Sequence, residues 1–206
     1  MNTPKKYREQ LPLMEHFYTI QGEGFHQGKA SYFIRFGGCD IACSWCDVKD
    51  SWPAEKHPLV PVDEIVRAAL QSKAKMCVVT GGEPMMHDLS LLTEKMHSHG
   101  IRLNVETSGA YEISGDWDWI CVSPKRFKQP TEAALKAADE LKVVIFHEND
   151  FRFAEKFAAK VKPDCKLFLQ PEWSNEKEML PSIIEYIKQH QQWEISLQIH
   201  KYMNIP

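Results

Sequence analysis

The chain has 206 residues, of which 43% are hydrophobic and 26% are charged. A chain of this length can bury the core of one domain, so residues 1–206 are interpreted as a single domain. The formal net charge of −3 and the lack of any apolar run near the roughly 20 residues of a membrane span argue against broad nucleic-acid or membrane binding.

Strands and helices are expected to alternate from residue 31 onward. In the helix predicted over 88–100, for example, Leu89, Leu92 and Met96 recur at helical spacing, and Gly100 suits the position after the helix. Residues 52–61 are interpreted as an ordinary loop. The predicted strands cover 31–36, 76–80, 101–106, 119–123, 141–146, 166–170 and 194–198, and the predicted helices cover 62–72, 88–100, 132–139, about 150–160 and about 175–191.

This alternation predicts an α/β fold with five or six buried parallel strands. A closed barrel of eight βα units typically needs about 250 residues, so an incomplete (partial) TIM-like βα barrel fits this chain better. In such folds the chemistry collects at the carboxyl ends of the strands. Polar signatures follow five of the predicted strands: a cysteine-rich stretch, "TGGEP", "ETSG", "SPK" and "QPE".

The cysteine-rich stretch, "GGCDIACSWCD" (37–47), contains Cys39, Cys43 and Cys46 and no fourth cysteine. Structural zinc needs four ligands, so His16 or His26 would have to complete the set. A [4Fe–4S] cluster fits the stretch better, because thiolates hold iron at such short spacings. With three thiolates, one iron keeps a coordination position that a small molecule can occupy.

The first residues, "MNTPKKYREQLP", lack the apolar core of a signal peptide, which predicts a cytoplasmic protein. Thiols stay reduced in that compartment, so the cysteines are not expected to form a disulfide framework. Cys77 and Cys121 lie inside apolar strands and Cys165 precedes one, which favours a core role for all three.

The CxxxCxxC spacing directly after the first strand of a partial barrel resembles the radical S-adenosylmethionine (SAM) superfamily. Nearly the whole chain resembles the 7-carboxy-7-deazaguanine synthase (QueE) family, through "YTIQGEG" (18–24), "FIRFGGCDIACSWCD" (33–47), "VVTGGEP" (78–84), "ETSG" (106–109), "SPK" (123–125), "LQPE" (169–172) and "SLQIHKYMNIP" (196–206). The resemblance implies a lyase of queuosine biosynthesis that converts 6-carboxy-5,6,7,8-tetrahydropterin to 7-carboxy-7-deazaguanine with loss of ammonia. A 5′-deoxyadenosyl radical from SAM would abstract a substrate hydrogen, and ring contraction would follow.

The same resemblance implies the site residues. Cys39, Cys43 and Cys46 would hold the cluster. Glu106, Thr107 and Ser108 are expected to line the site. The residues expected to bind SAM are Gly82, Glu83, Ser123, Pro124, Lys125, Gln170, Pro171, Glu172 and Trp173, and those expected to bind substrate are Ile20, Gln21, Gly22, Glu23, Arg35, Thr80, His200 and Pro206.

Some of these residues also have ordinary structural explanations. A buried Arg35 needs an anion, which the substrate carboxylate or an internal acidic residue can supply. Gly22 and Gly24 would suit a plain turn, and an isolated Lys125 would suit the solvated surface.

The chain departs from the family pattern after the third cysteine. The family usually has Thr there, which helps to hold Mg²⁺, but this chain has Val48, whose side chain has no oxygen. Asp47, Asp50, Ser51 or water would have to replace that ligand. A weak or dispensable Mg²⁺ site is therefore expected.

Two alternative functions are a glycyl-radical-enzyme activase and a non-catalytic iron–sulfur electron carrier. The activase would lack the "QGEG" and "HKY" segments, and the carrier would need a fourth cysteine ligand. The resemblance implies a flavodoxin-like reductant and a homodimer, with no nucleic-acid or membrane partner.

Replacement of Cys39, Cys43 or Cys46 by Ala is expected to abolish SAM cleavage, because each thiol would hold one iron. Cys77→Ala, in the core, should leave cleavage largely intact. The measurement is 5′-deoxyadenosine formation by the reconstituted proteins. Full activity of the Cys43→Ala protein would contradict the cluster assignment.

Overall fold

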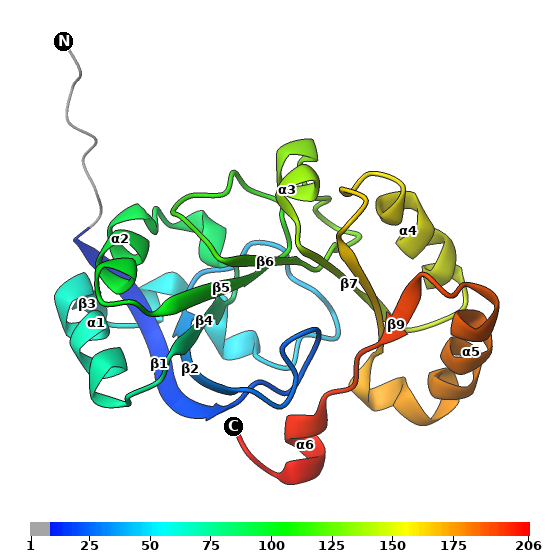
Figure 1. Ribbon diagram of the computed structural model, residues 1–206, viewed down its shortest axis with the longest axis horizontal. Coiled ribbons are helices and arrows are strands. Elements are labelled where there is room, and N and C mark those ends of the chain that lie inside the picture. Colours follow the sequence, from blue (N-terminus) through cyan, green and yellow to red (C-terminus); the bar gives the residue numbers. More distant parts are fainter. Residues whose placement is uncertain (1–8) are drawn as a thin grey trace.

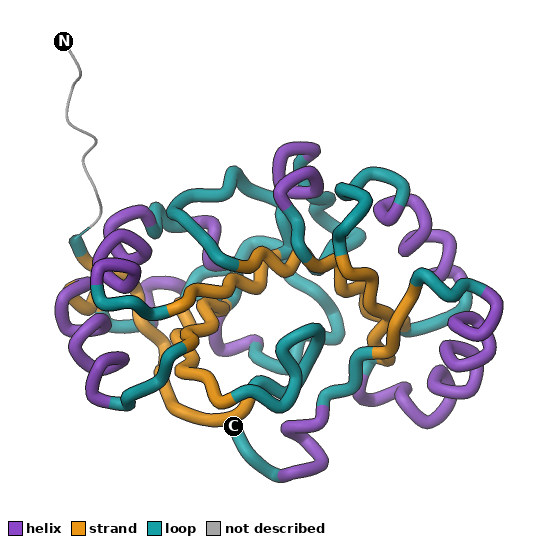
Figure 2. The backbone as a smooth tube through the Cα atoms, viewed as in Figure 1, coloured by secondary structure: helices purple, strands orange, loops and turns teal. Residues whose placement is uncertain are grey.

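The computed structural model describes residues 9–206, and within that range the strands form one nine-stranded sheet. The sheet curves into an open barrel wall (Figure 1), and its strands enclose loop segments (Figure 2). This architecture confirms the predicted α/β partial barrel. From one edge to the other the strands are β3 (Leu59–Pro61), β1 (Gln10–Ile20), β2 (Ala30–Phe36), β4 (Met76–Gly81), β5 (Arg102–Thr107), β6 (Trp119–Val122), β7 (Glu140–Ile145), β8 (Lys166–Pro171) and β9 (Trp193–Ile195).

Within residues 9–206, five of the six α-helices lie outside the curved sheet, and the sixth lies near the gap between β9 and the first two strands (Figure 1). Within residues 9–206 no helix is long and apolar enough to cross a membrane. The outer helices are α1 (Val62–Gln71), α2 (Ser90–Ser98), α3 (Glu132–Ala137), α4 (Asn149–Ala158) and α5 (Glu176–Gln189), and the helix at the gap is α6 (Ile199–Met203).

Within the described range, the run from β2 through β9 contains seven parallel strands, so the prediction of five or six was too low. Strands β1 and β3 are antiparallel additions that the sequence analysis did not predict. The interpretation of residues 52–61 as an ordinary loop was also wrong. Residues 54–56 form a 3₁₀ turn, and Val60 of β3 pairs with Leu11 of β1.

The predicted elements agree with the structure within two residues at each end, except for the last strand. That strand ends at Ile195 instead of residue 198, and the chain turns into α6. Gly100 follows α2 with a φ of +72°, the left-handed conformation in which glycine commonly ends a helix.

The core lies between the sheet and the outer helices in two clusters. One packs α1 and α2 against β2, β4 and β5, with Leu92, Met96 and Leu103 fully or almost fully buried. The other packs α3, α4 and α5 against β7 and β8, around Phe157 and Trp193. Burial of one such side chain contributes about 1.5–3 kcal/mol. The outer face of the sheet therefore carries much of the stability, and the inner rim is left for polar groups.

Candidate active site

A cavity of about 290 Å³ lies where the sequence signatures converge, at the carboxyl ends of the parallel strands. Its size suits a small-molecule ligand. Every predicted site residue lines it except Pro124, which is buried but does not face the cavity. The lining predicted residues are Ile20, Gln21, Gly22, Glu23, Arg35, Cys39, Cys43, Cys46, Thr80, Gly82, Glu83, Glu106, Thr107, Ser108, Ser123, Lys125, Gln170, Pro171, Glu172, Trp173, His200 and Pro206.

Backbone hydrogen bonds hold the loop that carries the three cysteines. The amides of Gly38 and Cys39 donate to the carbonyls of Ser51 (2.7 Å) and Trp52 (3.0 Å). The amide of Glu83, after β4, donates to the Gly38 carbonyl at 2.8 Å. The ends of β2 and β4 thus fix the loop together.

Gly82 allows the "TGGEP" segment to pack directly on this loop. A Cβ at position 82 would lie 2.5 Å from the Gly38 carbonyl oxygen and 2.6 Å from the Cys39 Cβ, closer than real contacts allow. From the family resemblance, Gly82 was expected to bind SAM. The structure adds a second requirement, the close approach of the cysteine loop.

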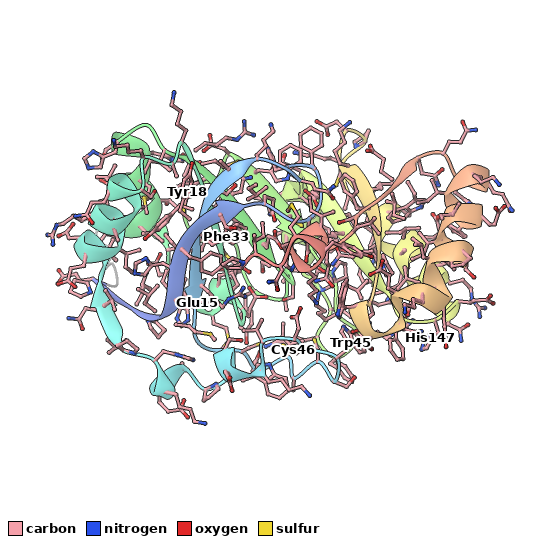
Figure 3. The ribbon with its side chains drawn as sticks, turned by 90° about the horizontal axis from the view of Figure 1, so that it is seen from below. Glu15, Tyr18, Phe33, Trp45, Cys46 and His147 are labelled. Atoms are coloured by element: carbon pink, nitrogen blue, oxygen red, sulfur yellow. The ribbon has the colours of Figure 1, made fainter. Side chains whose placement is uncertain are left out.

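Cys39, Cys43 and Cys46 are free thiols that line the cavity. Burial raises the pKa of Cys39 and that of Cys43, so these free thiols are protonated at neutral pH and a bound metal must displace the protons. Figure 3 shows Cys46 and Trp45 at one edge of the molecule, which places the cysteine loop near the surface.

The histidines considered for a fourth zinc ligand lie elsewhere. His16 forms a hydrogen bond with Tyr32, and His26 lies 3.2 Å from the amide nitrogen of Asn104. Neither lines the cavity. Neither histidine can therefore serve as a fourth zinc ligand beside the three thiols. This disfavours a structural zinc site.

Glu83 is a buried carboxylate whose partners are neutral donors. It accepts from the Thr107 hydroxyl at 2.5 Å, the Met85 amide at 3.0 Å, and the amide of Ser108 at 2.8 Å. The Ser108 hydroxyl is a further donor. These bonds tie the loop after β4 to the end of β5, so the "ETSG" segment has a structural role as well as a place in the lining.

Lys142, from the middle of β7, forms the centre of a buried polar cluster that the sequence analysis missed. Its side chain is 4% exposed, and its Nζ lies 2.6 Å from Glu23 Oε2 and 2.9 Å from Glu106 Oε2. We call Glu23, Glu106 and Lys142 the Lys142 cluster. A lysine inside the apolar run "LKVVIF" was the signal available in the sequence.

Amide side chains complete the hydrogen bonds of this cluster. Gln21 donates to Glu106 Oε1 at 2.7 Å, Gln198 donates to Glu23 Oε1 at 2.8 Å, and Gln170 donates to Glu23 Oε2 at 3.2 Å. Gln198 was not predicted as a site residue, although it lies in the quoted segment "SLQIHKY". Gln170, expected to bind SAM, bonds to the predicted substrate residue Glu23.

The charges of the Lys142 cluster stabilise one another. Burial alone would raise the pKa of Glu23, but the charge and hydrogen bond of Lys142 outweigh it and lower this pKa to about 2. Burial likewise opposes the charge on Lys142, yet Glu106 and Glu23 raise its pKa well above the ordinary value. Glu23 and Lys142 are therefore both ionised across the physiological pH range.

Arg35 has an internal acidic partner and also lines the cavity. Its side chain is 19% exposed and lines the cavity, and its Nε donates to Glu15 Oε1 at 2.7 Å. The pairing of β1 with β2 shifts between Leu13 and Glu15, and such irregularities re-aim side chains. Among residues 9–206, no protein group accepts from the two terminal nitrogens of Arg35. Those nitrogens remain available to an anion.

Lys125 is not the solvated surface charge that an isolated lysine would be. Its Nζ donates to the carbonyl and hydroxyl oxygens of Ser123, at 2.9 and 2.6 Å. Burial lowers its pKa from the ordinary value. The "SPK" segment therefore presents a partly desolvated cation at the cavity wall.

Helix α6 closes the side of the cavity. Lys201 pairs with Asp47 of the cysteine loop at 3.1 Å and lies over the Trp173 ring. The Ile199 amide donates to the Gly22 carbonyl at 3.0 Å. Burial lowers the pKa of His200, which favours its neutral form. The C-terminal segment is thus anchored to both the cysteine loop and the "QGEG" turn.

Comparison with known proteins gives consistent matches. Residues 33–117 match the radical SAM superfamily. The chain is 54% identical to a protein named 7-carboxy-7-deazaguanine synthase from Flavobacterium psychrophilum, covering 96% of this chain and 94% of that protein. It is 47% identical to a protein of the same name from Synechocystis, covering 94% and 93%. A crystal structure of QueE from Escherichia coli superposes with a TM-score of 0.83 at 29% identity, covering 92% and 94%.

Gly22→Ala is expected to loosen α6. A Cβ at this position would lie 2.3 Å from His200 Nδ1, so the histidine must move away. Overpacking of this kind typically costs about 1–3 kcal/mol. Amide hydrogen exchange at residues 199–203 should accelerate by about tenfold or more.

Gly28→Ala is the matched control. This glycine also lies after β1 and has no atom within 4 Å of its would-be Cβ, so Ala there adds backbone strain at a φ of +85° but no contact with α6. It should leave exchange in α6 unchanged. Equal exchange in wild type and Gly22→Ala would show that α6 does not depend on this contact.

Proposed function

The chain belongs to the 7-carboxy-7-deazaguanine synthase family of the radical SAM superfamily, and we propose how its cavity is divided between cofactors and substrate. It is a radical SAM enzyme that converts 6-carboxy-5,6,7,8-tetrahydropterin to 7-carboxy-7-deazaguanine with loss of ammonia, a step of queuosine biosynthesis. The activase and electron-carrier alternatives are not favoured, because the relatives at 54% and 47% identity carry the synthase name.

The observation that carries the proposed division is the placement of three free thiols and the Lys142 cluster in one cavity. Cys39, Cys43 and Cys46 would hold the [4Fe–4S] cluster, and the donor set fits, because thiolates are the usual ligands of such clusters. When bound, the cluster and SAM together supply the 5′-deoxyadenosyl radical that abstracts a hydrogen atom from the substrate.

The SAM side of the cavity is proposed to be the wall next to the cysteine loop. Gly82, Ser123 and Lys125 line it, together with residues 170–173 after β8. Lys125 supplies a positive charge suited to a carboxylate. Glu83 acts indirectly in this proposal, because Met85, Thr107 and Ser108 already donate to it.

The substrate carboxylate is proposed to bind at Arg35. Its two terminal nitrogens can form the paired hydrogen bonds that arginine makes with a carboxylate. Phe17 and Phe33, whose rings stack 5.4 Å apart, line the same side of the cavity. They provide an apolar surface for a flat ring. Figure 3 shows Phe33 and Glu15 on the same pair of strands.

The aminopyrimidine part of the pterin presents N–H donors, which suit the carboxylates of the Lys142 cluster. Glu106 is 24% exposed, and each of its oxygens accepts one protein hydrogen bond, from Gln21 or from Lys142. A carboxylate oxygen can accept two. Glu106 therefore has acceptor capacity left for two N–H groups of the substrate.

Helix α6 is proposed to exclude water from the reaction. His200 and Pro206 line the cavity, and the Lys201–Asp47 ion pair joins this helix to the cysteine loop. Exclusion of water protects a reactive intermediate from side reactions.

The residues present do not fit a strong Mg²⁺ site. Val48 lines the cavity but its side chain offers no oxygen, and Asp47 is already paired with Lys201. Ser51 donates to the Val48 carbonyl at 2.6 Å, and neither Ser51 nor Asp50 lines the cavity. Mg²⁺ prefers several hard oxygen ligands in octahedral geometry. A weak or dispensable site is proposed, and no step is assigned to the metal.

We also propose the domain organisation, oligomeric state, cellular location and partners of the enzyme. We propose a single domain over residues 1–206, a homodimer in the cytoplasm, and a flavodoxin-like protein as reductant. The small-molecule pterin is the substrate, and no nucleic-acid or membrane partner is proposed. The acidic net charge of −3 is in keeping with that view.

Anaerobic reconstitution tests the function directly. The protein is supplied with iron, sulfide, SAM, a reductant and the carboxytetrahydropterin, and the products are separated by chromatography. We expect 7-carboxy-7-deazaguanine and ammonium, formed only with the pterin and SAM together. Formation of 5′-deoxyadenosine with no pterin product would contradict the proposed function.

Arg35→Ala is expected to weaken pterin binding by about 2–5 kcal/mol, the range for removing one partner of a buried charge pair. SAM binding should change little, and anaerobic calorimetry with each ligand measures both. Glu15→Ala is the matched control, because it removes the ion pair but leaves the guanidinium in place. An equal loss of pterin and SAM affinity in Arg35→Ala would assign this residue a structural role.

Val48→Thr is expected to increase the response to Mg²⁺, because it adds an oxygen beside the cavity. The wild type should show only a modest rate stimulation when Mg²⁺ is titrated after chelation. A wild-type enzyme that is inactive without Mg²⁺ and restored at micromolar Mg²⁺ would contradict the weak-site proposal.

A further inference from the structure

The Lys142 cluster has an arrangement that the assigned reaction alone does not explain. Two carboxylates, Glu23 and Glu106, share one ammonium group whose side chain is 4% exposed. The three residues come from the loop after β1, from β5 and from β7, so the cluster spans the interior of the partial barrel. Lys142 is also the one group in this set that supplies a positive charge.

We propose that Lys142 is a positioning residue that keeps Glu23 and Glu106 ionised together and aimed at the cavity, so that they accept the N–H donors of the pterin ring. This inference rests on the proposed function, because the pterin supplies the donors. Lys142 itself does not contact the substrate in the proposal. Its Nζ is directed to the two carboxylates.

The hydrogen bonds support this division of roles. Lys142 occupies one oxygen of each carboxylate, and the amides of Gln198 and Gln21 occupy the other oxygens. Gln170 also donates to the Glu23 oxygen that Lys142 occupies, so Glu106 keeps acceptor capacity on both of its oxygens and Glu23 keeps it on Oε1. Glu106 retains the larger exposure, 24% against 16% for Glu23, which makes it the carboxylate most available to the ligand.

Without the ammonium group, the two carboxylates would repel each other in a site of low polarity. One of them would then retain a proton at neutral pH, as paired acids do when no cation separates them. A protonated carboxylic acid would offer a donor where the pterin also offers a donor. Pterin binding would weaken and would recover as the pH rises.

The other titratable groups near the cluster do not replace Lys142. His200 on α6 is driven toward its neutral form by burial, and burial keeps the Cys121 thiol neutral. Burial also lowers the pKa of Lys125, whose Nζ bonds to Ser123. Burial raises the pKa of Glu140, from β7, and this residue accepts hydrogen bonds from Trp119 and Phe25. In the described part of the chain, Lys142 is the cation bonded to both carboxylates.

The test compares Lys142→Met, Lys142→Arg and the double variant Lys142→Met/Glu23→Gln in the reconstituted enzyme. Lys142→Met should lower kcat/KM for the pterin by about 30-fold or more at neutral pH, with a rise toward alkaline pH that the wild type lacks. Lys142→Arg should restore part of the activity and the flat pH profile. The double variant should also have a flat profile, because only one of the two carboxylates remains. Lys95→Met is the control, since Lys95 forms an exposed ion pair with Asp63.

A spectroscopic readout separates this inference from the proposed function. Infrared difference spectra across a pH titration should show a protonated carboxylic acid near neutral pH in Lys142→Met. This signal should be absent in the wild type and in the double variant. The signal does not require substrate, so it tests the charge balance even if the pterin assignment fails.

Two results would overturn the proposal. One is a Lys142→Met protein with a flat pH profile and no protonated carboxylic acid. The other is a Lys142→Met/Glu23→Gln protein that keeps the pH dependence of the single variant. Thermal unfolding of each variant shows whether it folds. If Lys142→Met does not fold, the same measurements on the folded Lys142→Arg protein decide the question. A pH-dependent kcat/KM in Lys142→Arg would then overturn the proposal.

Discussion

A buried ammonium group must find its counter-charges inside the fold, and Lys142 imposes that constraint on this barrel. The transfer of an ion out of water costs several kcal/mol, so the surrounding segments must supply carboxylates and amides in fixed positions. Glu106 does so from β5 and Glu23 from the loop after β1. Gln198, near the C-terminal helix, completes the arrangement. Segments far apart in the sequence thus meet at one charge.

The end of β5 connects this charge to the cysteine loop. Glu106 bonds to Lys142, whereas the next two residues, Thr107 and Ser108, bond to Glu83. Glu83 in turn donates its amide to Gly38, beside the first cysteine of the loop. The short segment "ETSG" therefore joins the proposed substrate side of the cavity to the proposed cofactor side. A shift at either side would be transmitted through three consecutive residues.

Much of the fold could be predicted from the sequence, because buried parallel strands read as apolar runs and their polar ends fall at one rim. Strand β1 was missed because Pro12 and Glu15 interrupt its pattern and the chain shifts register there. Lys142 could not be predicted from the polar residues that follow the strands, because this lysine lies within a strand. Pro124 was expected in the lining because it stands between Ser123 and Lys125, but sequence adjacency does not reveal which way a residue faces. The partners of Gln170 and Arg35 depend on segments distant in sequence, so no local pattern could identify them.

The short strands at the two edges of the sheet bear on how this protein avoids unwanted association. A sheet that does not close leaves unpaired backbone groups at its edges, where a strand from another molecule can add. Here β3 and β9 have three residues each, and Pro61 in β3 lacks an amide hydrogen. Such edges give an incoming strand few hydrogen bonds and little length for pairing. The barrel can therefore remain open for its ligands without offering a template for fibrillar growth.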